Sequence, residues 1–173
     1  MTRTRATAAW STLAALLLIS LPGLVHAACE ASVGKFVSIT GSVDVQPSGG
    51  NAWSGAKLET RLCEGDTIRV GERSRAAVSL INNAVLRIDH NTAMRLIDIS
   101  PEDEEQSLLD LFTGAFQSFS RKPKFLRVNT PYLNGSVEGT EFVFRVSDDE
   151  ATITVLEGVV LASNNQGELR VTP

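Results

Sequence analysis

The sequence is poor in the residues from which metal and catalytic sites are built. Its 173 residues include only two histidines and two cysteines, too few for a zinc module with four Cys or His ligands. It also lacks the basic excess of a nucleic-acid-binding protein, since 16 Lys and Arg stand against 20 Asp and Glu. We therefore predict no metal site, no cofactor and no nucleic-acid partner.

Long apolar runs are confined to the N-terminus. Arg3 and Arg5 precede a run rich in Leu and Ala, and the small-residue pattern Val25-His26-Ala27 follows it. These are the three regions of a secretory signal peptide. Pro22 interrupts the run, which is shorter than the ~20 apolar residues that a membrane-spanning helix needs. We predict a signal peptide over 1–27 and, after its cleavage, an acidic exported protein without an integral membrane segment.

The two cysteines allow two fates for the exported chain. An even number of cysteines in an exported protein predicts a disulfide, here between Cys29 and Cys63. Closing that loop would stabilise the fold by about 3–4 kcal/mol on the chain-entropy model. In the alternative, Cys29 is the acylated first residue of a lipoprotein, although His26 stands where such sites usually have a large aliphatic residue.

No segment beyond the signal peptide has the periodicity of an amphipathic helix. From Phe36 onward, apolar residues alternate with polar ones or form short runs, with turn residues about every 8–12 positions. This pattern predicts an all-β fold of many short, mainly antiparallel strands, compatible with a sandwich, a roll or a solenoid. Gly114 is predicted to be the turn of a hairpin between 108–112 and 115–119. Further strands are expected at 67–70, 76–81, 85–88, 94–97, 125–130, 141–146 and 152–156.

No linker or change of composition divides the chain after the signal peptide. We predict an N-terminal segment over 28–35 and one β domain over 36–173. The acidic run 102–105 is expected to be a solvated loop, because it lacks the spaced ligands and internal glycine of a calcium-binding loop. Residues 168–173 have the pattern of a strand that stops short, which suggests a fragment or a truncated gene.

Candidates for catalysis are few. His90 follows Asp89 in a turn-like segment, and no Gly-x-Ser-x-Gly motif supplies a nucleophile for it. Glu138 and Glu141 are the carboxylate pair that glycoside hydrolysis would use, but two nearby glutamates more often have surface or turn roles. We therefore predict that the protein is not an enzyme.

A short basic cluster is the best local candidate for an anionic partner. Its basic residues, with their aromatic neighbours, are Arg121, Lys122, Lys124 and Arg127, with Phe119 and Phe125. Such a cluster suits an anionic glycan, a phospholipid headgroup or an acidic protein surface, and Tyr132 and Trp53 would extend it toward glycan binding. The alternative is an exposed turn around Pro123 whose Lys and Arg protect a strand edge.

Several motifs, in the same order along the chain, resemble the FecR domain. The first half of the resemblance rests on Gly65–Gly71, Ser74-Arg75-Ala76, Leu86-Arg87-Ile88-Asp89 and Asn91-Thr92. The second half rests on residues 119–123, Val128-Asn129-Thr130-Pro131-Tyr132, Val137-Glu138-Gly139-Thr140-Glu141-Phe142 and Val155-Leu156-Glu157-Gly158-Val159. The matches cover about residues 36–167.

The most specific matching residues form what we call the signature: Thr130, Pro131, Gly139, Thr140, Glu141, Phe142, Glu157 and Gly158. We expect it to mark turns and core rather than an active site. Gly139 would permit a chain reversal or a close backbone approach, with a positive φ, and Gly158 would separate two strands. Phe142 and Phe144 would share one face of a strand.

The resemblance implies a periplasmic β domain of a Gram-negative bacterium, without known catalysis. FecR regulators control sigma factors in response to iron–siderophore signals from an outer-membrane receptor. This sequence differs from them, since it has a cleavable signal in place of the cytoplasmic anti-sigma segment and membrane helix, and lacks the receptor-docking C-terminal portion. The resemblance therefore implies an exported, periplasmic binding or signalling module of the cell envelope, with an envelope protein or an anionic glycan as its partner. The alternative is a glycan- or peptidoglycan-binding or scaffold module.

Overall fold

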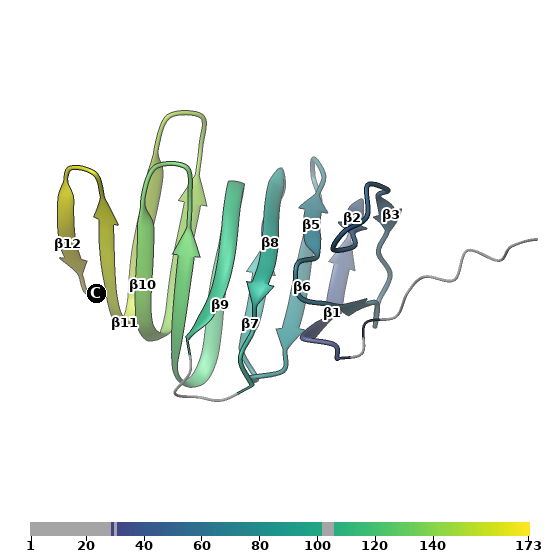
Figure 1. Cartoon of the computed structure of the whole chain (residues 1–173), viewed down its shortest axis with the longest axis horizontal. Coiled ribbons are helices and arrows are strands. Elements are labelled where there is room, and N and C mark those ends of the chain that lie inside the picture. Colours follow the sequence, from purple (N-terminus) through teal and green to yellow (C-terminus); the bar gives the residue numbers. More distant parts are fainter. Residues whose placement is uncertain (1–28, 30, 102–105) are drawn as a thin grey trace, which may run out of the picture.

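The computed structural model describes residues 29, 31–101 and 106–173, and within them every regular element is a β-strand (Figure 1). The predicted signal peptide and the acidic run 102–105 lie outside the described residues. The strands are β1 Gly34–Thr40, β2 Val43–Gln46, β3 Ser54–Gly55, β4 Arg61–Leu62, β5 Thr67–Val70, β6 Arg75–Leu80, β7 Val85–Ile88, β8 Thr92–Asp98, β9 Ser107–Asn129, β10 Asn134–Val146, β11 Ala151–Asn164 and β12 Gly167–Val171. The prediction of an all-β fold is confirmed.

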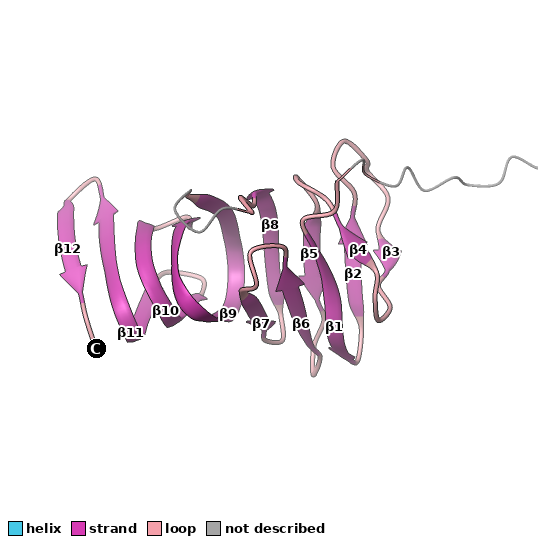
Figure 2. Cartoon of the chain, turned by 90° about the horizontal axis from the view of Figure 1, so that it is seen from below, coloured by secondary structure: helices cyan, strands magenta, loops and turns pink. Residues whose placement is uncertain are grey.

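All strands belong to one 12-stranded antiparallel sheet that curls upon itself (Figure 2). The main path runs β3-β2-β5-β8-β9-β7-β6-β1-β4, and β10, β11 and β12 add successively beyond β9. Of the three architectures compatible with the sequence, the structure is a roll. Its two layers face each other across one apolar core.

The long strand β9 coils around the core and so belongs to both layers, pairing first with β8 and then with β7. It pairs with β8 through 108–113 and then with β7 through 116–119. A bulge over 120–123 precedes its last segment, 124–129, which pairs with the start of β10. The end of β9 thereby returns beside the start of the same strand, where Asn129 Nδ2 donates to Asp110 Oδ1 at 3.0 Å.

The predicted hairpin at Gly114 is wrong, because Gly114 is a bend inside β9. Its φ is 86°, and a Cβ there would lie 2.3 Å from Thr92 Oγ1. Thr92 is buried, and its hydroxyl accepts from Ala115 N at 3.0 Å and donates to Ala115 O at 3.1 Å. These contacts from β8 fix the bend.

Two of the short strands are confirmed as predicted. The strand expected at 67–70 is β5, and the strand expected at 85–88 is β7.

Three phenylalanines fill the core under β9 and β10. Phe116 stacks on Phe144 with 5.9 Å between ring centroids, and Phe142 packs edge-on against both. All three are at most 1% exposed, so the prediction that Phe142 and Phe144 share a face is confirmed. Burying a side chain of this size stabilises by about 1.5–3 kcal/mol.

The predicted disulfide between Cys29 and Cys63 is present. It ties the N-terminal end of the described chain to the residue after β4, and Val33 N donates to Leu62 O at 2.8 Å beside it. β1 begins at Gly34, within the segment 28–35 that was expected to precede the β domain.

Candidate functional site

The signature glycines lie opposite each other where β10 and β11 bend between the layers. Gly139 pairs with Gly158, and the strand register shifts directly after this pair. A Cβ on Gly139 would lie 2.7 Å from the carbonyl oxygen of Glu157, and one on Gly158 would lie 2.4 Å from the Gly139 Cα. The two glycines therefore permit a backbone approach that any side chain would block.

The expectations for these glycines are confirmed in part. The close approach at Gly139 is present, but the positive φ predicted there is wrong, since Gly139 lies inside β10 with no chain reversal. The positive φ, 115°, belongs to Gly158. Gly158 does not separate two strands but lies inside β11, where the bend demands it.

The signature residues Thr130 and Pro131 form the turn between β9 and β10. Thr130 Oγ1 accepts hydrogen bonds from Tyr132 N at 3.3 Å and Leu133 N at 3.1 Å, and donates to Leu133 O at 2.7 Å. A hydroxyl that satisfies its own backbone in this way stabilises a turn. The turn thus sets the register in which β10 returns along β9.

The remaining signature residues surround the bulge in β10. Thr140 is buried, and its hydroxyl has no hydrogen-bond partner within the described residues. Glu141 accepts a hydrogen bond from Gln117 Nε2 at 2.5 Å, and Glu157 is exposed. Phe142 belongs to the aromatic core.

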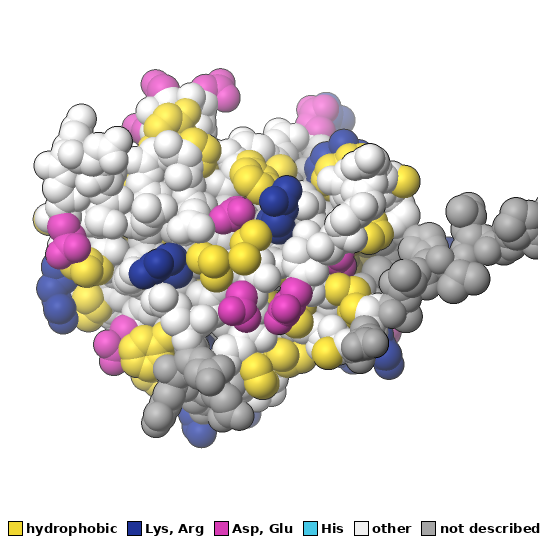
Figure 3. Space-filling view, viewed as in Figure 1, with side chains coloured by type: hydrophobic (Ala, Val, Ile, Leu, Met, Phe, Trp, Pro, Cys, Tyr) yellow, Lys and Arg dark blue, Asp and Glu magenta, His cyan; other side chains and the backbone are white. Residues whose placement is uncertain are grey.

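The structure leaves only part of the predicted basic surface exposed. Arg121 and Lys122 are exposed on the β9 bulge, and Arg127 is exposed further along the strand. Lys124 is only 7% exposed and therefore contributes nothing to such a surface, because strand alternation turns it toward the core. Charged side chains of both signs are scattered over the face seen in Figure 3.

The two aromatic residues proposed for glycan binding are also far from one another. Tyr132 lies in the turn between β9 and β10, where its hydroxyl donates to Asp148 O. Trp53 directly precedes β3, at the opposite end of the sheet, and the Arg69 guanidinium lies 4.3 Å from its ring centroid. No single surface contains both.

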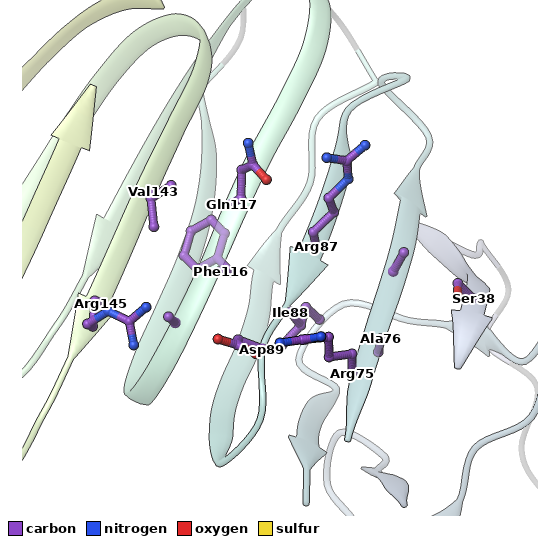
Figure 4. Close-up of a pocket in the computed structure, with 12 residues that line it drawn as sticks. Ser38, Arg75, Ala76, Arg87, Ile88, Asp89, Phe116, Gln117, Val143 and Arg145 are labelled. Atoms are coloured by element: carbon purple, nitrogen blue, oxygen red, sulfur yellow. Dashed lines mark hydrogen bonds and ion pairs between the residues drawn. The ribbon is translucent and has the colours of Figure 1, made fainter. Parts of the chain in front are cut away.

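A groove that the sequence pattern does not predict crosses the outer face of β6, β7, β9 and β10 (Figure 4). Its volume is about 540 Å³. Strand register aligns a row of outward-facing residues along it: Ala77, Arg87, Gln117 and Val143. Arg75, Asp89 and Arg145 line it beside that row. We call this feature the arginine groove.

The charges in the arginine groove are unequally paired. Arg75 Nε donates to Asp89 Oδ1 at 3.2 Å, and His90 Nδ1 lies 3.0 Å from the same oxygen. In the ranges that the structure describes, neither Arg87 nor Arg145 has a carboxylate within salt-bridge distance. Figure 4 shows Asp89 between Arg75 and Arg145, and Arg87 beside Gln117. Two guanidinium groups are thus available to an anionic ligand.

The pKa of Asp89 reflects this setting. Burial raises it, but hydrogen bonds from the His90 side chain and backbone and from Arg75, together with the His90 charge, outweigh burial and lower the pKa from 3.8 to about 2. Asp89 therefore stays ionised and paired with Arg75 throughout the neutral and mildly acidic range.

Replacing Asp89 by asparagine is expected to change how stability depends on pH. A lowered folded-state pKa stabilises the fold above about pH 4, and this contribution is lost as the pH falls toward 2. Since the side chain is 30% exposed, solvent screening limits the effect to about 1 kcal/mol. Urea unfolding should separate wild type from Asp89→Asn at pH 6 and bring them together near pH 2. A constant difference across that range would contradict the assignment.

None of the three catalytic candidates lines the arginine groove, and one of them, His90, contacts the Asp89 carboxylate that does. His90 is exposed in the turn after β7 and contacts Asp89. Glu138 and Glu141 both stand on the outer side of β10, but neither lines the arginine groove. In the described part of the chain, no three His, Cys, Asp or Glu side chains are grouped so that they could hold a metal ion.

The protein is an all-β domain in which one antiparallel sheet curls around an aromatic core and bends at a pair of glycines. The model of the family described as FecR protein matches residues 66–161, which is more than half of the chain. The chain therefore belongs to the FecR family. No curated protein sequence matches the chain.

Two crystal structures of candidate anti-sigma factors from Parabacteroides distasonis have a similar fold. Their TM-scores are 0.53 and 0.52, both at 20% sequence identity, and each match covers 62% of this chain and 51% of the other. The chain thus matches about half the length of these proteins. Among the described residues, no helix is long and apolar enough to cross a membrane.

Proposed function

We propose that the protein is an exported, non-enzymatic regulatory module of the bacterial envelope that acts by binding a protein partner. Membership of the FecR family and the similarity to candidate anti-sigma factors support a signalling role. The observation that carries export is the disulfide between Cys29 and Cys63, because such bonds persist in oxidising compartments. The signal-peptide pattern over 1–27 agrees with it.

The non-enzymatic part of the proposal is supported by the surroundings of the candidate carboxylates. Glu138 is exposed on a strand, and Glu141 is held by Gln117 rather than facing the arginine groove. Acid–base catalysis needs two positioned groups around a bound substrate. The placement of these two glutamates supports a role in a binding surface and not in catalysis.

Fractionation with thiol labelling tests export directly. The full chain, expressed in a Gram-negative host, should appear in the periplasmic fraction, cleaved after Ala27. A maleimide reagent under denaturing conditions should label no cysteine before reduction and two after it. A cytoplasmic protein with two reactive thiols would overturn the proposal, and an acylated N-terminal Cys29 would show the lipoprotein alternative to be correct.

Glycan binding is the competing function, and a sedimentation assay separates the two. Because Trp53, Tyr132 and Arg121 lie on different parts of the molecule, we expect no retention on peptidoglycan at low salt. Retention that Arg121→Gln abolishes would favour the glycan-binding module instead.

A further inference from the structure

We propose that the arginine groove binds an extended acidic segment of a partner protein, with Arg87 and Arg145 pairing with two of its carboxylates. This inference names the partner chemistry of the proposed regulatory module and rests on that function. It is carried by the juxtaposition of two unpaired arginines in one groove on an otherwise acidic protein.

The groove is built so that its arginines remain available. Asp89 is the acidic residue in the lining, and Arg75 and His90 already occupy its Oδ1. Another carboxylate on the outer side of β10, Glu141, accepts from Gln117, which lies in the row that contains Arg87. Guanidinium groups favour carboxylates because their planar forks donate two parallel hydrogen bonds.

The spacing of the arginines admits a ligand with two separated negative charges. Arg87 lies on β7 and Arg145 on β10, with β9 between them, and the register sets them two residues apart along the strands. With strands about 4.8 Å apart and a rise of about 3.3 Å per residue, the two Cα atoms are roughly 12 Å apart. Each arginine has a long, flexible side chain, so the two guanidinium groups can receive two carboxylates of an extended peptide, whose alternate side chains recur about every 7 Å, or converge on one anion. The aliphatic part of the lining decides between these ligands in favour of the peptide.

The rest of the lining fits a polypeptide better than a sugar chain. Ala77 and Val143, both half-buried, give the groove an aliphatic floor between the charges. The aromatic ring in the lining, Phe116, is 1% exposed and so offers no face for stacking. Binding sites are typically lined by apolar side chains, with a few polar groups that fix the orientation of the ligand.

Binding of a synthetic peptide to the purified, oxidised protein tests this proposal. The probe is a ten-residue peptide with alternating glutamates, compared with its glutamine counterpart and with polygalacturonate. We expect the acidic peptide to bind at 50 mM NaCl, the glutamine peptide not to bind, and the Arg87→Gln/Arg145→Gln variant to bind at least fivefold more weakly. Raising the salt to 300 mM should weaken binding further.

A matched variant controls for net charge. Arg121→Gln/Arg127→Gln removes the same two charges away from the groove and should change affinity less than twofold. Both pairs are exposed, so thermal melting should confirm that neither variant loses its fold. Failure to bind the acidic peptide, an equal loss in both double variants, or stronger binding of polygalacturonate through Arg87 and Arg145 would overturn the proposal. None of these results would alter the outcome of the export test, so the two proposals fail separately.

Discussion

Replacing Gly158 by alanine should destabilise the fold by about 3 kcal/mol or more. Its φ of 115° is one that residues with a side chain rarely adopt, which costs about 1–3 kcal/mol. The new Cβ would also lie 2.4 Å from the Gly139 Cα and 2.5 Å from the Glu138 carbonyl oxygen. Overpacking of this kind adds about 1–3 kcal/mol. Urea unfolding followed by circular dichroism measures the change.

Two other glycines separate the contributions of strain and collision. Gly49 has a φ of 72° but open space around its Cβ position, so Gly49→Ala should cost about 1–2 kcal/mol. Gly55 has open space and no positive φ, so Gly55→Ala should change stability by less than about 0.5 kcal/mol. If Gly158→Ala were as stable as Gly55→Ala, the bend between the layers would not depend on the glycine pair.

Loss of the disulfide should have the next largest effect. Cys29 and Cys63 are separated by 34 positions, and closing a loop of this length stabilises by roughly 3–4 kcal/mol on the chain-entropy model. The double variant Cys29→Ser/Cys63→Ser should therefore unfold at a clearly lower urea concentration than oxidised wild type. The double change avoids leaving a free thiol.

Reduction provides the control for that comparison. A reducing agent should lower the unfolding midpoint of wild type to that of the double variant and leave the variant itself unchanged. Equal midpoints for oxidised wild type and the double variant would mean that the contacts of Val33 and β1 hold the N-terminal end without the bond.

Short strands between clear turn residues could be predicted from the sequence. The boundaries of β5 and β7 agree with prediction because Glu64-Gly65-Asp66 and Asn82-Asn83 mark local chain reversals. Gly114 has the same local appearance, but its role depends on Thr92 of β8, whose hydroxyl holds Ala115. Long strands that bend around a core are fixed by such distant contacts, which local patterns do not reveal.

In the candidate site, too, local sequence predicts some features, whereas contacts between distant strands determine the others. Arg87 and Arg145 are 58 positions apart in the sequence, and only the pairing of β7, β9 and β10 places them in one groove. Their outward position could be predicted from strand alternation, but their proximity could not. Conversely, Lys124 lies beside Arg121 and Lys122 in sequence, yet alternation after the bulge buries it.

The transcript profile of a deletion strain shows whether the protein regulates through a partner bound at the envelope, as we propose. Deleting the gene in the native bacterium should change the transcript levels of a defined set of genes. Wild type should restore them, whereas Arg87→Gln/Arg145→Gln, exported at the same level, should not. An unchanged transcript profile in the deletion strain would mean that the protein has no such regulatory role.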